Sequence, residues 1–140
     1  MKNAMLVPIA LIAIAGNAQT PEDLKIIREV VREVQKELTA DGMVGLKNKS
    51  MEYHKAAIGK KDRGSMIKCM AFDMQCHLID SSMTESMKTN PYTYFTKPKL
   101  SERWMLLFET RSFSKPEDVQ KLIQQITKSL QEETDKMLSE

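Results

Sequence analysis

The sequence predicts an all-α protein, a small domain of four to six helices around one central helix that follows a cleaved signal peptide. Apolar residues recur at spacings of three and four along several stretches, which is the period of an amphipathic helix. Capping residues and prolines stand where two of these stretches begin. The stretch from Ser65 to Lys88 carries two apolar strips instead of one, which indicates a helix covered from both sides.

The first helix is predicted to begin after Thr20. Thr20 suits the N-cap and Pro21 the first helical position, and two acidic residues follow them near the positive end of the helix dipole. Its apolar stripe consists of Leu24, Ile27, Val31, Val34 and Leu38. We expect the helix to end at residues 39–42, where Gly42 follows Thr39, Ala40 and Asp41.

Residues 43–64 are predicted to form a loop with at most a short helix over 50–58, because glycines interrupt this part of the chain. It is also the most basic part, with Lys47, Lys49, Lys55, Lys60, Lys61 and Arg63. We interpret these charges as a solvated surface, and a site for an anionic partner is the alternative. Asn48 begins the sequon Asn48-Lys49-Ser50, a possible glycosylation site if the source is eukaryotic.

The central helix is predicted over residues 65–88. One apolar strip holds Ile67, Ala71, Met74 and Leu78, and the other holds Cys69, Phe72, Cys76, Ile79, Met83 and Met87. Cys69 and Cys76 are seven residues apart, roughly 10 Å along a helix, whereas a disulfide needs Cα atoms within about 7 Å. We therefore predict free, buried thiols in a monomer. The alternatives are a break in the helix or an antiparallel dimer with two symmetric disulfides.

The rest of the chain is predicted to complete the bundle. Residues 90–98 form a proline-bounded connection with three aromatic residues, which we expect to fold over the core. A helix over 101–111 carries Trp104, Met105, Leu107 and Phe108. A capping box at 114–117 opens the last helix, whose apolar face is Val119, Leu122, Ile123, Ile126, Leu130 and Met137.

Residues 1–18 have the features of a secretory signal peptide. Lys2 precedes an apolar run from Ala4 to Ala15. Gly16-Asn17-Ala18 then supplies the small residues of a cleavage site, and we expect cleavage after Ala18. About 12 apolar residues are too few to span a bilayer, which needs about 20, although an uncleaved anchor is the alternative. The sequence thus predicts one domain over 19–140, without a membrane span, that is extracellular, or periplasmic in a bacterium.

No motif in the sequence indicates catalysis, a metal or a cofactor. Asp73 and His77 are four residues apart and could form an acid–base pair, but this spacing also occurs in ordinary helix contacts. Cys69, Cys76 and Met83 share a face, yet the close ligand pairs of structural zinc sites are missing. The net charge of +2 argues against a nucleic-acid partner. We therefore expect a protein that is not an enzyme and uses no cofactor.

The methionine content favours a binding function. Of the 11 methionines, all except Met1 and Met5 lie after the predicted cleavage site. Methionine-rich interiors are deformable and accept ligands or partner side chains of varied shape. The predicted apolar cavity is surrounded by Phe72, Met74, Met83, Trp104, Phe108 and Ile123.

In outline the chain resembles the insect odorant-binding and pheromone-binding family. The resemblance lies in the signal peptide, the opening Thr20-Pro21-Glu22-Asp23-Leu24 and the stretch Lys68-Cys69-Met70-Ala71-Phe72-Asp73. Asp73 stands where the family has a second cysteine, and no cysteine follows Cys76, so the family's disulfide framework is missing. The resemblance implies a secreted helical carrier that encloses small apolar molecules.

A second class of function fits the same features. Asn17-Ala18-Gln19 also resembles the end of a bacterial signal peptide. A small periplasmic helical protein could be an inhibitor or immunity protein, often dimeric, that binds a toxin or an enzyme. The source of the protein distinguishes the two hypotheses, since animal secretion favours the carrier and bacterial export favours the inhibitor.

Overall fold

The computed structural model describes residues 20–109 and 116–140. Within these ranges the chain forms four α-helices and one 3-10 turn and no strand, so the protein is all-α. The elements are α2 (Pro21–Lys60), α3 (Arg63–Met87), the turn η1 (Thr93–Phe95), α4 (Lys97–Glu109) and α5 (Pro116–Leu138). The predicted signal peptide and most of the predicted capping box at 114–117 lie outside the described residues.

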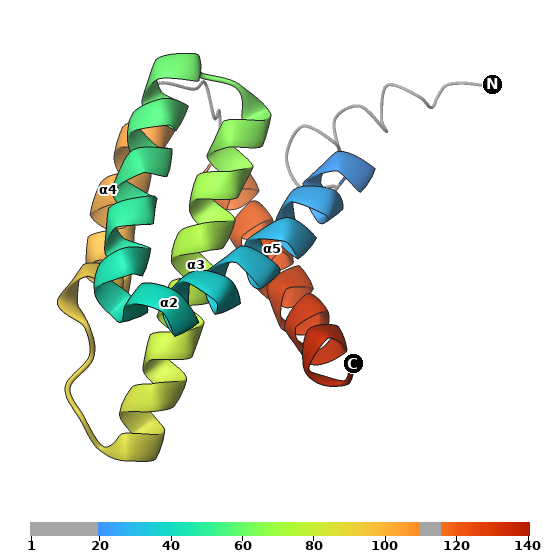
Figure 1. Ribbon diagram of the computed structural model, residues 1–140. Helices are drawn as coiled ribbons and strands as arrows, with labels where there is room; N and C mark the ends of the chain where they lie inside the picture. The colour runs from blue at the N-terminus through green and yellow to red at the C-terminus, as the bar shows by residue number, and fades with distance from the viewer. Residues whose placement is uncertain (1–19, 110–115) are drawn as a thin grey trace.

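The central position of α3 is confirmed, because it contacts every other described helix (Figure 1). The second half of α2 and α4 lie on one side of it, and α5 crosses it on the other. Both predicted strips of α3 are buried over its first half, with Ile67 and Ala71 from one strip and Cys69, Phe72 and Cys76 from the other. The prediction is wrong at the far end, where Met83 is only half-buried and Met87 is 58% exposed, because α3 extends there past the helices that cover it.

The start of α2 is as predicted. Thr20 is the N-cap, its hydroxyl accepts from the Asp23 backbone 3.0 Å away, and the Asp23 carboxylate accepts from the Thr20 backbone. Arg63 also donates to this buried carboxylate, with Nη2 2.8 Å from Oδ2. Asp23 therefore completes the capping box of α2 and also connects the first turn of α2 to the first turn of α3.

The predicted break at residues 39–42 is confirmed as a kink at Gly42, but the predicted loop over 43–64 is wrong. Gly42 does leave the helical region, with φ 66° and ψ −159°, but α2 resumes and continues to Lys60 in a new direction. The second half is helical because it buries Leu46 and Ala57 in the core, and such packing outweighs weak local propensity. The Tyr53 hydroxyl donates to Glu33 across the kink and joins the two halves.

The aromatic connection after α3 folds onto the core. Phe95 in η1 is fully buried, with Tyr94 packed edge-on against it at 4.9 Å between ring centroids. Two side chains of α3 hold the backbone of this segment. The Asp80 carboxylate accepts from the Tyr92 backbone at 2.9 Å, and the His77 ring donates to the Phe95 carbonyl at 2.8 Å.

The last helix, α5, packs on α3 and on the first half of α2. Leu122, Ile126 and Leu130 are buried, which confirms the centre of its predicted apolar face. Gln75 of α3 donates to Thr134 at 2.9 Å, and Arg28 of α2 pairs with Glu133 at 3.2 Å. The apolar stripe and two polar contacts thus fix α5 against α3 and the first half of α2.

Candidate functional site

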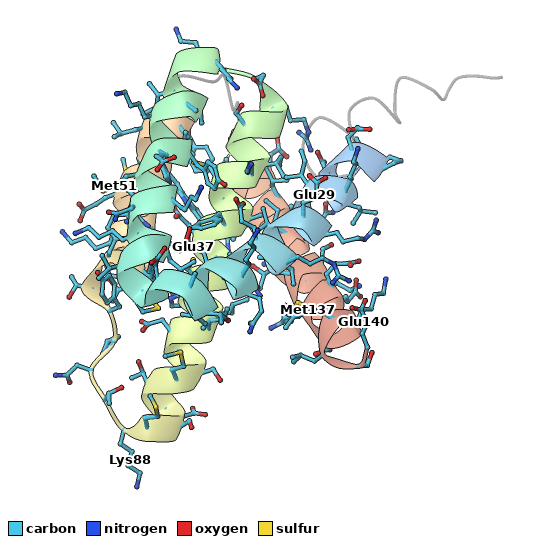
Figure 2. All side chains as sticks on the ribbon, in the orientation of Figure 1. Glu29, Glu37, Met51, Lys88, Met137 and Glu140 are labelled. Atoms are coloured by element: carbon cyan, nitrogen blue, oxygen red, sulfur yellow. The ribbon has the colours of Figure 1, made fainter. Side chains whose placement is uncertain are left out.

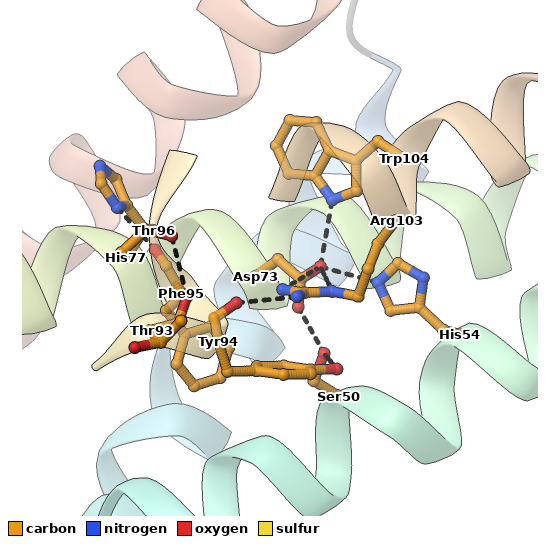
Figure 3. Close-up of polar contacts among 10 residues, drawn as sticks. All are labelled: Ser50, His54, Asp73, His77, Thr93, Tyr94, Phe95, Thr96, Arg103 and Trp104. Carbon is orange, nitrogen blue, oxygen red and sulfur yellow. Dashed lines mark hydrogen bonds and ion pairs between the residues drawn. The ribbon is translucent and has the colours of Figure 1, made fainter. Parts of the chain in front are cut away.

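A fully buried carboxylate, Asp73 of α3, lies where α2, α3, η1 and α4 meet (Figure 3). Its Oδ1 accepts from the Ser50 hydroxyl at 2.6 Å. Its Oδ2 is 2.7 Å from His54 Nε2 and 3.1 Å from Trp104 Nε1. We call the residues gathered here the Asp73 cluster: Ser50, His54, Asp73, Tyr94, Arg103 and Trp104.

Arg103 of α4 provides the permanent positive charge of the cluster. Its Nε lies 3.3 Å from Asp73 Oδ2, and its Nη1 donates to the Tyr94 carbonyl at 2.7 Å. The guanidinium also stacks on the Tyr94 ring, 3.7 Å from the centroid, a contact that favours arginine over lysine. The Tyr94 hydroxyl is 2.9 Å from the Ser50 hydroxyl and closes the ring of contacts.

The electrostatics of the cluster favour an ionised Asp73. Burial alone would raise the pKa of this carboxyl group. The hydrogen bond and charge of His54, the charge of Arg103 and the Ser50 hydroxyl outweigh burial and hold the pKa below its usual value. Burial raises the pKa of the Tyr94 phenol, so that group stays neutral.

The cluster is built to join helices and lacks the geometry of a catalytic site. A nucleophilic serine needs a base against its hydroxyl, whereas Ser50 and His54 each bond to Asp73 and to different oxygens of it. The possible acid–base pair of Asp73 and His77 is also not formed, because His77 bonds to the Phe95 carbonyl. All of these carboxylate contacts are intramolecular and buried, so they hold α2, α4 and η1 on α3.

Beside the cluster, α3, α4 and α5 enclose an open groove of about 520 Å³, which we call the α5 groove. Its apolar walls come from Met74, Leu78, Leu100, Trp104 and Ile123. Its polar side chains are His77, Lys97, Ser101, Gln120, Gln124, Thr127, Lys128 and Gln131. A concave apolar floor with a few polar groups around it is typical of small-molecule sites.

The six residues predicted to surround one cavity are divided among three places. Met74, Trp104 and Ile123 line the α5 groove. Met83 lines a second groove of about 420 Å³ with Ile79, Met137 and Leu138. Phe72 is fully buried, with its ring 5.1 Å from that of Tyr53, and Phe108 is half-buried against the core.

The sequence reasoning missed Ser50, His54 and Arg103. Ser50 and His54 lie in the short helix predicted over 50–58, within a segment interpreted as a solvated surface. Their spacing of four residues, flanked by Leu46 and Ala57 at similar intervals, is the signal that could have found them. Arg103 is three residues after Leu100 and precedes Trp104, which places it at the edge of the buried face of α4.

Cys69 and Cys76 are free and buried, with 1% and 0% of their surface exposed, as predicted. Burial raises the pKa of both thiols, which keeps them protonated and unreactive. Across residues 20–109 and 116–140, no group of three or more histidine, cysteine or acidic side chains is placed to hold a metal ion. None of the helices in these ranges is both long and apolar enough to cross a bilayer.

Comparison of the chain with protein-family models, with curated proteins and with solved structures gives no match.

Proposed function

We propose that the protein is an exported, non-enzymatic binding protein that carries a small apolar ligand between α3, α4 and α5. The observation that supports this most is the α5 groove. Its volume of about 520 Å³ falls in the range of small-molecule sites, about 300–1,000 Å³. Methionine and leucine side chains on its walls adapt to ligands of different shape.

The polar side of the groove favours a ligand with an acceptor or anionic head. Lys97 and Lys128 line it, and no aspartate or glutamate is among its described lining residues. His77 adds a third polar group. Because a carbonyl oxygen only accepts, His77 Nδ1 is the atom that donates to Phe95, so the preference for an anionic head comes from the two lysines. The ligand class is therefore an amphiphile with an apolar tail, as in fatty acids.

Export and subunit state form part of the same proposal. Residues 1–18 would be removed as a signal peptide, leaving 19–140 as a single helical domain outside the cell or in a periplasm. The buried thiols support a monomer, since neither sulfur is placed to pair with a second chain. Asn48 is exposed on α2, so glycosylation in a eukaryotic source remains part of the proposal.

The test is displacement of a fluorescent apolar probe, N-phenyl-1-naphthylamine, by long-chain fatty acids. Ile123→Trp is the informative variant because Ile123 is a half-buried groove wall. Trp104→Ala would be ambiguous, since Trp104 also bonds to Asp73. Filling the α5 groove should weaken probe binding about tenfold or more, with little change in the melting temperature.

Met83→Trp is the matched control because it fills the second groove instead. Equal probe binding by both variants and by the unmodified protein would contradict a ligand site in the α5 groove. Native mass spectrometry of material from its host provides a second result. A stoichiometric protein partner in place of a bound lipid would favour the inhibitor or immunity protein instead.

A further inference from the structure

The second half of α2 exposes a row of apolar side chains to solvent. Val44, Met51 and Ile58 are 60%, 53% and 37% exposed and stand seven residues apart. Seven residues are nearly two helical turns, so the three side chains share one side of the helix over about 21 Å. Met51 projects outward from the bundle on this face (Figure 2). We call these three residues the α2 row.

Lys47 and Lys55 lie beside the α2 row on the helix surface, whereas Lys49 and Lys60 project from the other side of the helix. Residues 43–61 contain five lysines, Lys47, Lys49, Lys55, Lys60 and Lys61, against the single acid Glu52. Lys55 is four residues after Met51 and three before Ile58, so it lies next to both on the helix surface. The first half of α2 differs, because acidic and basic side chains alternate along its exposed face.

This face is presented on a firmly held helix. Another side of the same half of α2 carries the buried residues Leu46, Ser50, His54 and Ala57, and two of these, Ser50 and His54, bond to Asp73. The orientation of the α2 row is thus set by the core and requires no partner. Its exposure is a property of the folded protein.

We propose that the α2 row is a docking surface for an anionic phospholipid membrane. Val44, Met51 and Ile58 would enter the headgroup region while Lys55, the exposed lysine beside them, pairs with a lipid phosphate. The composition separates this partner from a protein. Protein interfaces are enriched in aromatic residues, methionine and arginine and depleted in lysine. The α2 row has one methionine but no aromatic residue or arginine, and apolar side chains flanked by lysine are typical of helices that lie on membranes. The surface is distinct from the α5 groove, so the proposal goes beyond ligand binding.

Co-sedimentation with vesicles tests the proposal. Vesicles of phosphatidylcholine with an equal part of phosphatidylglycerol should bind the protein, and pure phosphatidylcholine should bind it at least tenfold more weakly. Met51→Asp should reduce binding to the anionic vesicles about tenfold or more because it removes an inserted side chain and adds a negative charge. Lys55→Ala should reduce it about fivefold, the contribution of one lysine near an anionic surface.

Met105→Asp is the matched control, since Met105 is 60% exposed on α4. Binding equal to that of the unmodified protein is expected for this variant. Circular dichroism and melting curves should be the same for all variants, as all three sites are exposed. The proposal is overturned if Met51→Asp binds like Met105→Asp. It is also overturned if polyglutamate competes away all vesicle binding regardless of Met51, which would indicate a purely ionic site for an acidic polypeptide.

Discussion

The two sides of α3 are packed in different ways. Toward α2 and α4, the Asp73 carboxylate accepts hydrogen bonds from side chains of both helices and is fully buried. Toward α5, Met74 and Leu78 face an open groove with apolar walls. A buried charge with several fixed partners tolerates little movement, whereas aliphatic walls can repack around a ligand. One helix thus combines a rigid attachment to α2 and α4 with an adaptable surface toward α5.

The largest effect is expected from Asp73→Ala. Removing the carboxylate leaves the half-buried Arg103 without its ion pair and the buried His54 and Trp104 without their acceptor. The free energy of unfolding should fall by about 3–5 kcal/mol, measured by urea denaturation. Glu102→Ala, at an exposed residue of α4, is the control and should change it by less than about 0.5 kcal/mol. A loss below about 1 kcal/mol for Asp73→Ala would mean that the cluster does not hold the helices together.

Gly42→Ala tests the stability of the Asp73 side of α3 indirectly, because the kink at Gly42 directs the second half of α2 toward Asp73. A φ of 66° with ψ −159° is accessible almost only to glycine, so the variant should lose about 1–3 kcal/mol of stability. Gly59→Ala is the matched control in the same helix. A Cβ there meets nothing within 4 Å, and the variant should gain about 0.5–1 kcal/mol. Equal effects of the two changes would show that the kink carries no strain for alanine.

Acid should loosen the Asp73 side before the α5 side. The pKa of Asp73 is lowered in the folded state, so its contribution is present above the unfolded pKa of about 3.9 and is lost as the pH falls through the lower folded value. Asp73→Asn should therefore flatten the decline in unfolding free energy below pH about 4. Glu140→Gln should leave that decline almost unchanged. The pKa of Glu140 is also lowered by Arg32, but this pair is exposed and screened by solvent.

The smallest effect is expected on the groove side. Ile123→Ala should cost roughly 1 kcal/mol, because Ile123 is half-buried and its removal uncovers little apolar area. The same change should weaken binding of the apolar probe if the groove is the ligand site. A stability loss as large as that of Asp73→Ala would remove the distinction between the two sides of α3.

The spacing of apolar residues was enough to predict those helices whose buried face can be recognised from the nearby sequence alone. The capped start at Thr20 and the first half of the two strips of α3 are confirmed, since capping residues and apolar residues at helical spacing mark them in the sequence. Because glycine has low helix propensity, Gly42, Gly45 and Gly59 argued against a continuous helix in the second half of α2. Local propensity there was outweighed by burial of Leu46 and Ala57, which depends on α3.

The sequence by itself determined the helical class, the burial of Cys69 and Cys76 and the fact that α3 is covered on both sides. Only the tertiary structure decided the partners of Asp73, because Ser50, Arg103 and Trp104 are 23, 30 and 31 residues away from it in the chain. It also decided that Met74, Trp104 and Ile123 share a groove while Met83 and Phe72 do not. The physical reason is that periodicity assigns a side chain to a face of its own helix, whereas the neighbour of that face depends on how the helices cross.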